Sequence, residues 1–149
     1  MPGVYQIMNA SRIADRVYGE IHLPEAAARL SSTIEFSRLD DIRQLGGCAF
    51  VYPSATHTRR EHSIGVCHLS GLVATHLKKL YPEKVSDDDV LCVQLAGLVH
   101  DLGHGPFSHL FEEYVGDDFC HEVMGVKLFR IMFENHPEIN LETYFDGDI

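Results

Sequence analysis

Three histidines and an aspartate lie within ten positions in the segment HDLGHGPFSH, residues 100–109. The segment follows a largely apolar run, VLCVQLAGLV, which is typical of a buried helix. Neutral imidazole and carboxylate groups bind Fe, Mn, Zn, Ni and Co, and His100 and Asp101 offer one of each. His104 follows one helical turn after His100, so we expect both on the same face. These residue types and spacings predict a divalent transition-metal site.

A further candidate ligand, His62, lies near the start of residues 59–82, whose 3.6-residue periodicity predicts a long helix. Its apolar stripe, expected to face the core, consists of His62, Val66, Leu69, Val73, Leu77 and Leu80. If this helix and the next one pack antiparallel, His62 reaches the level of His100 and Asp101. A single histidine is more often a hydrogen-bonded core or surface residue than a ligand. That interpretation applies to His22, His57, His68, His76 and His136.

The elements that must position these residues are helices. The predicted helices span residues 25–45, 59–82, 86–104 and 121–136. The first is expected to break near Ser31 and Ser32 and to end at the glycines 46 and 47. Ser86 and Asp89 have the spacing of a capping box at the start of the third helix, which is apolar enough to be central. Its stripe consists of Leu91, Leu95, Leu98 and Leu102. With almost no strand alternation, the pattern predicts an all-α fold.

Length and composition limit the class of protein. The chain has 149 residues, 45% hydrophobic and 23% charged, as expected for one globular domain. It has neither a secretory signal pattern nor the roughly 18 to 20 apolar residues of a membrane span, so we expect an intracellular protein, cytoplasmic or nuclear, without a membrane partner. The net charge of −10 argues against a nucleic-acid partner. The four cysteines form no C-x-x-C pair, which predicts reduced, mostly buried thiols.

Several segments resemble the HD-domain phosphohydrolases, and more narrowly the deoxynucleoside triphosphate triphosphohydrolases. The matching segments are EFSRLDDIRQLGG, YPSATHTRREHSIGV, VLCVQLAGLVHDLGHGPFSH and the HE pair at 121–122. The resemblance runs from about residue 12 to about residue 136, and LAGLVHDLGHGPFSH is specific to this subfamily. It implies an HD-domain helical bundle that hydrolyses a dNTP, its small-molecule partner, to deoxynucleoside and inorganic triphosphate. It also suggests a homo-oligomer.

By this resemblance the metal ligands are His62, His100 and Asp101, and Asp101 also counts as catalytic. The expected cofactor is Fe, Mn, Zn, Ni or Co, alone or with Mg²⁺. A fourth ligand, an aspartate, is expected on a helix beyond the last residue, so residues 1–149 are expected to form a single HD domain truncated at its C-terminus. Asp146 or Asp148 could substitute only from a turn-like tail.

The resemblance also implies a substrate site. Gln44 matches a glutamine at the sugar hydroxyl, and Arg59 matches an arginine at the phosphates that is also catalytic. His104 and His109 match histidines near the α-phosphate. His121 matches a histidine that shares proton transfer with His104, and either of the two would protonate the leaving sugar oxygen.

Two alternatives remain open. The chain could be an HD phosphohydrolase for another nucleotide, such as a nucleoside monophosphate or a guanosine polyphosphate. It could also be a non-catalytic module that binds nucleotide or a partner. Gln44, Arg59 and the extension over 104–109 favour the triphosphate, whereas the missing fourth ligand favours the non-catalytic module.

Overall fold

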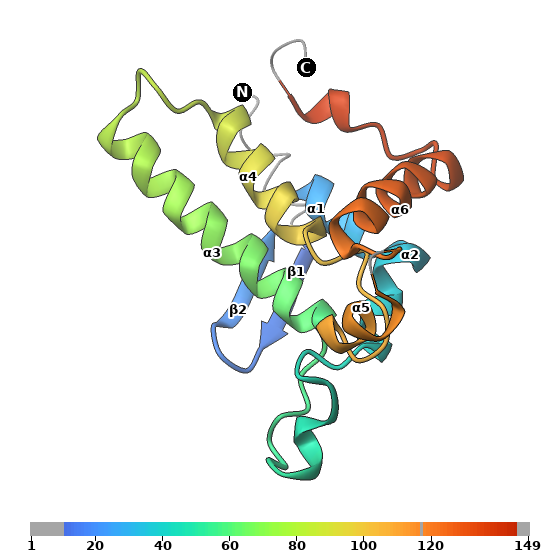
Figure 1. Cartoon of the computed structure of the whole chain (residues 1–149). Helices are drawn as coiled ribbons and strands as arrows, with labels where there is room; N and C mark the ends of the chain where they lie inside the picture. The colour runs from blue at the N-terminus through green and yellow to red at the C-terminus, as the bar shows by residue number, and fades with distance from the viewer. Residues whose placement is uncertain (1–10, 117, 146–149) are drawn as a thin grey trace.

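The computed structural model describes residues 11–116 and 118–145, in which helices dominate, as the all-α prediction requires. The α-helices are α1 (Glu25–Ser31), α2 (Ile34–Ser37), α3 (Arg59–Leu80), α4 (Asp87–Val99), α5 (His109–Val115) and α6 (His121–Asn135). The 3₁₀ helices are η1 (Arg38–Asp41), η2 (Gly46–Phe50) and η3 (Leu141–Tyr144). Figure 1 shows α3 and α4 as neighbours that run in opposite directions, with α6 on the other side of α4. This arrangement places the start of α3 near the end of α4.

A small hairpin precedes the helices and was not predicted. Its strands are β1 (Ser11–Asp15) and β2 (Gly19–Leu23), paired antiparallel. The Asp15 carboxylate accepts two backbone hydrogen bonds in the turn, and Gly19 completes it with a φ of +78°. Only β2 contributes fully buried side chains, Ile21 and Leu23, to the core. Two five-residue strands, of which only one contributes fully buried side chains, are too short to show a clear alternation of apolar and polar residues in the sequence.

The predicted break in the first helical segment is confirmed. The helix α1 ends at Ser31, and Thr33 caps α2 by accepting a hydrogen bond from the backbone N–H of Phe36. Helical structure does not run on to residue 45, however, and the glycines 46 and 47 begin η2 instead of ending a helix. The glycine pair therefore lies at the start of a short 3₁₀ helix, before the loop that leads to α3.

Capping boxes fix where α3 and α4 begin. The Ser86 hydroxyl accepts a hydrogen bond from the Asp89 N–H and the Asp89 carboxylate accepts one from the Ser86 N–H, as predicted. Thr58 and Glu61 form the same reciprocal pair at the start of α3. Both pairs satisfy backbone donors that a helix N-terminus otherwise leaves unpaired. The second pair sets the start of the helix that carries Arg59 and His62.

The predicted core stripe of α3 is wrong. Leu69, Val73, Leu77 and Leu80 are 42% to 59% exposed. The buried face instead consists of Ser63, Ile64, Gly65, Cys67, Gly71 and Ala74. Small residues let the helices approach closely: a Cβ on Gly71 would lie 2.3 Å from Gln94, and one on Gly97 of α4 would lie 2.6 Å from Ser70. The close approach of the two helix backbones, and not the hydrophobicity of the side chains, therefore determines which face of α3 packs against α4.

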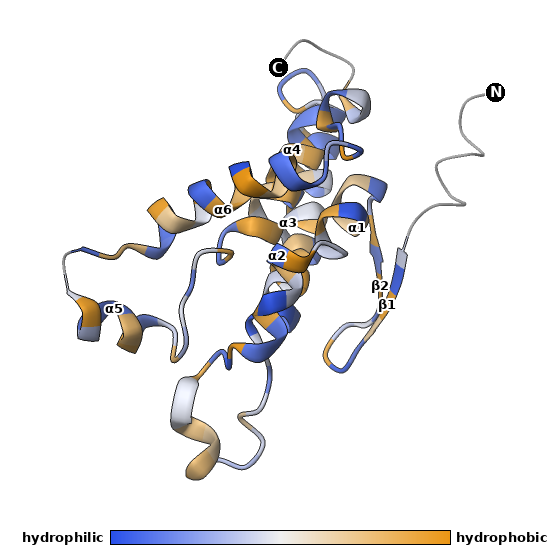
Figure 2. Ribbon diagram, turned by 90° about the vertical axis from the view of Figure 1, so that its right-hand side faces the viewer, coloured by the Kyte–Doolittle hydropathy of each residue, from blue (hydrophilic) through white to orange (hydrophobic). Residues whose placement is uncertain are grey.

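The core joins the hairpin and most of the helices. It contains Ile21, Leu23, Leu30, Phe36, Leu39, Leu95, Leu98, Leu102 and Met132, among others. The stripe predicted for α4 is thus buried at Leu95, Leu98 and Leu102, but Val93 on its other face is 46% exposed, so α4 is not enclosed all round. The hydropathy-coloured view in Figure 2 shows apolar residues gathered where α4 and α6 face α1 and α2.

Two composition-based expectations are settled within the described residues. All four cysteines are free, but only Cys67 is buried, while Cys48, Cys92 and Cys120 are exposed. The expectation of mostly buried thiols is therefore wrong. None of the helices that the structure describes is both long and apolar enough to cross a membrane.

Candidate functional site

His62, His100 and Asp101, hereafter the first cluster, meet where the start of α3 packs against the end of α4. The ring centroids of His62 and His100 are 5.2 Å apart. Asp101 lies between them, with Oδ2 3.4 Å from His62 Nε2 and Oδ1 3.3 Å from His100 Nε2. One ligand atom from each residue fits within a 4.8 Å group. The antiparallel packing thus brings together the three residues whose types suggested metal binding.

Burial and hydrogen bonding set the charges in the first cluster. Burial alone would raise the pKa of Asp101, but hydrogen bonds, led by the one from His100, outweigh it and hold the pKa well below its usual range. Burial lowers the pKa of His62, whereas the hydrogen bond to Asp101 raises that of His100. A charged carboxylate beside imidazoles is a donor set that divalent transition metals accept, so these residues fit such an ion.

Arg59, the first residue of α3, is only 3% exposed and contacts the same carboxylate. Its Nη1 lies 2.5 Å from Asp101 Oδ2, and its Nε donates to Ser108 Oγ at 3.0 Å. The Ser108 hydroxyl also donates to the carbonyl oxygen of Arg43 at 3.1 Å. Sequence reasoning missed Ser108, whose φ of +58° is rare for a residue with a side chain. The serine links the buried guanidinium to the backbone of the neighbouring loop.

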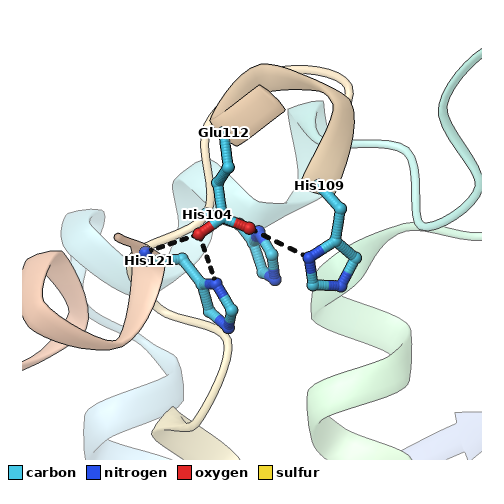
Figure 3. A group of neighbouring side chains, drawn as sticks. All are labelled: His104, His109, Glu112 and His121. Carbon is cyan, nitrogen blue, oxygen red and sulfur yellow. Dashed lines mark hydrogen bonds and ion pairs between the residues drawn. The ribbon is translucent and has the colours of Figure 1, made fainter. Parts of the chain in front are cut away.

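Four more polar residues form a second cluster, His104, His109, Glu112 and His121, drawn in Figure 3. The rings of His104 and His121 stack with centroids 3.9 Å apart and planes 11° apart. His109 packs edge-on against both, at 4.7 and 5.3 Å. The two histidines predicted to bind substrate, His104 and His109, therefore lie in ring contact with His121, which was predicted to take part in proton transfer.

Glu112 organises the second cluster and was not predicted. Its Oε2 lies 3.0 Å from His109 Nδ1 and its Oε1 lies 2.7 Å from His121 Nδ1. The backbone N–H of His121 donates to the same Oε1 at 2.8 Å. These hydrogen bonds hold the pKa of Glu112 down at about 2. The three-residue spacing of His109 and Glu112 was the sequence signal available, but the contact with His121 comes from the fold.

The expected placement of His104 on the same helical face as His100 is wrong. The helix α4 ends at Val99, and the chain then turns, with hydrogen bonds from Leu102 N to Val99 O and from His104 N to Asp101 O. Gly103 packs against the backbone of α6, where a Cβ would lie 2.0 Å from the His121 carbonyl oxygen. This close approach directs His104 to the second cluster, although its Nε2 remains 3.4 Å from Asp101 Oδ1.

Arg38 of η1 fixes the loop between the two clusters. Its Nη1 donates to the carbonyl oxygen of Leu102 at 2.7 Å and its Nη2 to that of His104 at 2.6 Å. Both acceptors are main-chain atoms of the turn that follows α4, three and five residues after its last residue, Val99. No residue type near the histidine motif signals this contact, so sequence reasoning missed Arg38.

Gln44 lies at the edge of the second cluster. It lines a cavity of about 500 Å³ together with Phe107, Ser108 and His109. Its Oε1 is buried and accepts no hydrogen bond from the described part of the chain. A second cavity, of about 450 Å³, lies between the hairpin and α3 and includes His62 in its wall. The predicted sugar contact is thus next to a histidine of the second cluster. Asp146 and Asp148 lie outside the described residues.

The sequence of residues 59–145 matches the HD domain family. That span includes both clusters and covers more than half of the chain, so this chain belongs to the HD-domain family. It is 42% identical over 138 residues to the deoxynucleoside triphosphate triphosphohydrolase SAMHD1 of Gallus gallus, covering 87% of this chain and 22% of that protein.

The chain is also 38% identical over 152 residues to the Dictyostelium discoideum homolog of SAMHD1, covering 97% of this chain and 29% of that protein. The chain is 50% identical over 101 residues to SAMHD1 of Homo sapiens, covering 67% of this chain and 16% of that protein. The chain therefore spans less than a third of the length of these relatives.

Proposed function

We propose that this chain is the HD core of a metal-dependent dNTP triphosphohydrolase, which releases deoxynucleoside and inorganic triphosphate. The observation that carries the proposal is the meeting of His62, His100 and Asp101 beside a buried arginine and three further histidines. Family membership and the names of the relatives support the reaction class.

The first cluster would hold the ion through His62, His100 and Asp101. A bound divalent metal supplies Lewis acidity to a phosphoryl oxygen and lowers the pKa of a bound water. Fe, Mn, Zn, Ni and Co all suit imidazole and carboxylate ligands, with Mg²⁺ as a further ion. A fourth ligand would come from outside the described residues. Because Asp101 is held as a charged carboxylate, it can attract the ion without first losing a proton.

The substrate would lie between the two clusters. Arg59 supplies a fixed positive charge for the phosphates, although Asp101 already binds part of its guanidinium. His104 and His109 would approach the α-phosphate. Gln44 would offer a sugar hydroxyl its carbonyl oxygen, which has no hydrogen-bond partner within the described residues. His104 or His121 would protonate the leaving sugar oxygen. Glu112 would orient His121 for that transfer through the 2.7 Å contact at Nδ1.

The proposal also covers the partner, the assembly and the location of the protein. We propose a nucleotide as the small-molecule partner, a homo-oligomer as the assembled form, and an intracellular location, cytoplasmic or nuclear. The acidic net charge of −10 supports a small ligand held by local cations rather than a nucleic acid.

The test measures bound metal and dNTP turnover together, scored as deoxynucleoside plus inorganic triphosphate. The experiment compares the parent chain, the double variant His100→Ala/Asp101→Ala and a control, His76→Ala. The control removes an exposed histidine of α3. The proposal expects metal and turnover in the parent and the control and neither in the double variant. Turnover only with another nucleotide would support the broader phosphohydrolase alternative. Metal-free, inactive but folded chain would support a non-catalytic HD module.

A further inference from the structure

Asp101 supplies the carboxylate of the first cluster, and a cation already occupies it. Nη1 of Arg59 lies 2.5 Å from Oδ2, closer than the Nε2 atoms of His62 and His100, which lie 3.4 and 3.3 Å from the carboxylate. We propose that Arg59 pairs with Asp101 only while the site is empty, and that a metal ion displaces the guanidinium toward the substrate phosphates. Because the ion at the first cluster is part of the proposed function, the displacement of Arg59 rests on that proposal.

Burial makes the two uses of Asp101 compete. The side chains of Arg59 and Asp101 are only 4% and 6% exposed, so water screens the charges around them poorly. A divalent ion on the same carboxylate would repel the guanidinium and neutralise the negative charge that holds it. The ion would also replace Arg59 as the partner that compensates the desolvation of Asp101. Each cation therefore weakens the binding of the other to this carboxylate.

Ser108 provides a second attachment for the guanidinium once Asp101 is lost. Nε of Arg59 donates to Ser108 Oγ at 3.0 Å, and the Ser108 hydroxyl is itself fixed because it donates to the carbonyl oxygen of Arg43 at 3.1 Å. Ser108 also lines the cavity of about 500 Å³ that contains Gln44 and His109. The guanidinium is thus one hydrogen bond away from the wall of the space proposed for the substrate.

Release from Asp101 leaves Nη donors of Arg59 available to an anion. A guanidinium binds phosphate oxygens best when its donors act in pairs, which the contact with Asp101 prevents in the empty site. Metal binding should therefore strengthen phosphate binding, and phosphate binding should strengthen metal binding by the same factor. The ion then has two effects on the phosphates, its own charge and the release of Arg59.

The displacement can be observed in the parent chain by NMR of arginine side chains labelled with ¹⁵N. A guanidinium held by an ion pair rotates slowly about its Cζ–Nη bonds and gives separate Nη signals. Arg59 should show separate signals in chelator and lose the separation when Zn²⁺ is added. Arg38 is the internal control, because its Nη atoms donate to the carbonyl oxygens of Leu102 and His104 and should stay separate. Arg59→Lys assigns the signals.

The release can also be tested without metal, with inorganic tripolyphosphate as the probe and a chelator present. Asp101→Asn removes the negative charge that holds Arg59, so it should bind the probe at least about tenfold more tightly than the parent. Adding Arg59→Met should abolish the gain. The matched control is Asp40→Asn, which removes the carboxylate paired with the neighbouring Arg60 at 2.8 Å and should bind the probe as the parent does. Calorimetry measures binding, and thermal unfolding checks each variant.

Two results would overturn the displacement of Arg59. One is a parent chain that binds Zn²⁺ by calorimetry while Arg59 keeps its separate Nη signals. The other is a folded Asp101→Asn chain that binds tripolyphosphate no better than the parent. A parent chain that binds no Zn²⁺ would instead contradict the metal site of the proposed function, and the displacement of Arg59 would fail with it.

Discussion

Arg59 and Asp101 form an ion pair whose side chains are only 4% and 6% exposed. The arginine begins α3, and the aspartate follows the end of α4, so the pair joins the two helices at the first cluster. Each charge loses favourable hydration when it is buried. The two charges stabilise the fold only as a pair, because their mutual attraction compensates for that loss. The hydroxyl of Ser108 satisfies a further donor of the guanidinium.

Replacing Arg59 by alanine should strongly destabilise the metal-free chain. The change leaves the carboxylate of Asp101 buried without its cation, and breaking such a pair costs about 3 to 5 kcal/mol. Urea unfolding in the presence of a chelator measures the loss. The control is Arg130→Ala, which removes an exposed arginine of α6. Equal free energies of unfolding for the Arg59→Ala and Arg130→Ala chains would contradict a structural role for the pair.

The two capping boxes allow stability and function to be separated. Thr58→Ala and Ser86→Ala each remove a helix N-cap and should each lower the free energy of unfolding by about 1 kcal/mol. Only Thr58 precedes the turn that carries Arg59 and His62. Thr58→Ala should therefore also weaken metal binding at the first cluster, whereas Ser86→Ala should not. Urea unfolding and metal titration of both variants test this difference, and matching metal affinities would show that the cap does not position the cluster.

Gly103→Ala should separate the loop after α4 from α6. The added Cβ would lie 2.0 Å from the carbonyl oxygen of His121 and 2.3 Å from the backbone nitrogen of Gly125. Because these are main-chain atoms, whole segments must move, which should lower the free energy of unfolding by about 1 to 3 kcal/mol. Gly47→Ala is the control, since its Cβ would meet Phe50 at an ordinary 3.6 Å. A Gly103→Ala chain as stable as the control in urea would refute the close packing.

Sequence reasoning succeeded where a local signal matched the tertiary contact. The serine-aspartate spacing at Ser86 marked the start of α4, and the position of His62 at the head of a helix placed it level with His100. It failed for the buried face of α3, because periodicity ranks Leu69 above Gly71 as a core residue. Close contact between helices favours the glycine instead. The contact surface of α3 follows from the partner helix, which a single-sequence pattern does not contain.

In the candidate site, too, the sequence identified some of the residues and missed others. Its histidines were visible as a motif, but the residues that orient them were not. Glu112 contacts His121 across nine positions of sequence, and Arg38 reaches the carbonyl oxygen of His104 across 66. No sequence spacing predicts such contacts, because the geometry of the loops and helices between the two residues decides whether they meet. The residue types therefore indicated the chemistry, and the fold was needed to identify what holds the side chains in place.

The buried carboxylate of Glu35 should make stability depend on pH. Its Oε1 accepts a hydrogen bond from Asn135 Nδ2 at 2.6 Å, and its Oε2 lies 3.1 Å from His136 Nε2, which ties α2 to the end of α6. Burial alone would raise the pKa of Glu35, but these hydrogen bonds outweigh it and lower the pKa below its ordinary value of 4.5. A lowered folded-state pKa means that the ionised group stabilises the fold above pH 4.5.

Glu35→Gln should therefore lower the free energy of unfolding by about 1.5 to 3 kcal/mol at neutral pH, the usual range for hydrogen bonds to a charged group. This difference between parent and variant should shrink as the pH falls below 4.5 and through the lower folded-state pKa, because the parent then also carries a neutral carboxyl. Urea unfolding at a series of pH values measures the difference. Glu134→Gln, at an exposed position of α6, controls for the general loss of a negative charge. A Glu35→Gln penalty that stays constant with pH would show that the ionised carboxylate is not what joins α2 to α6.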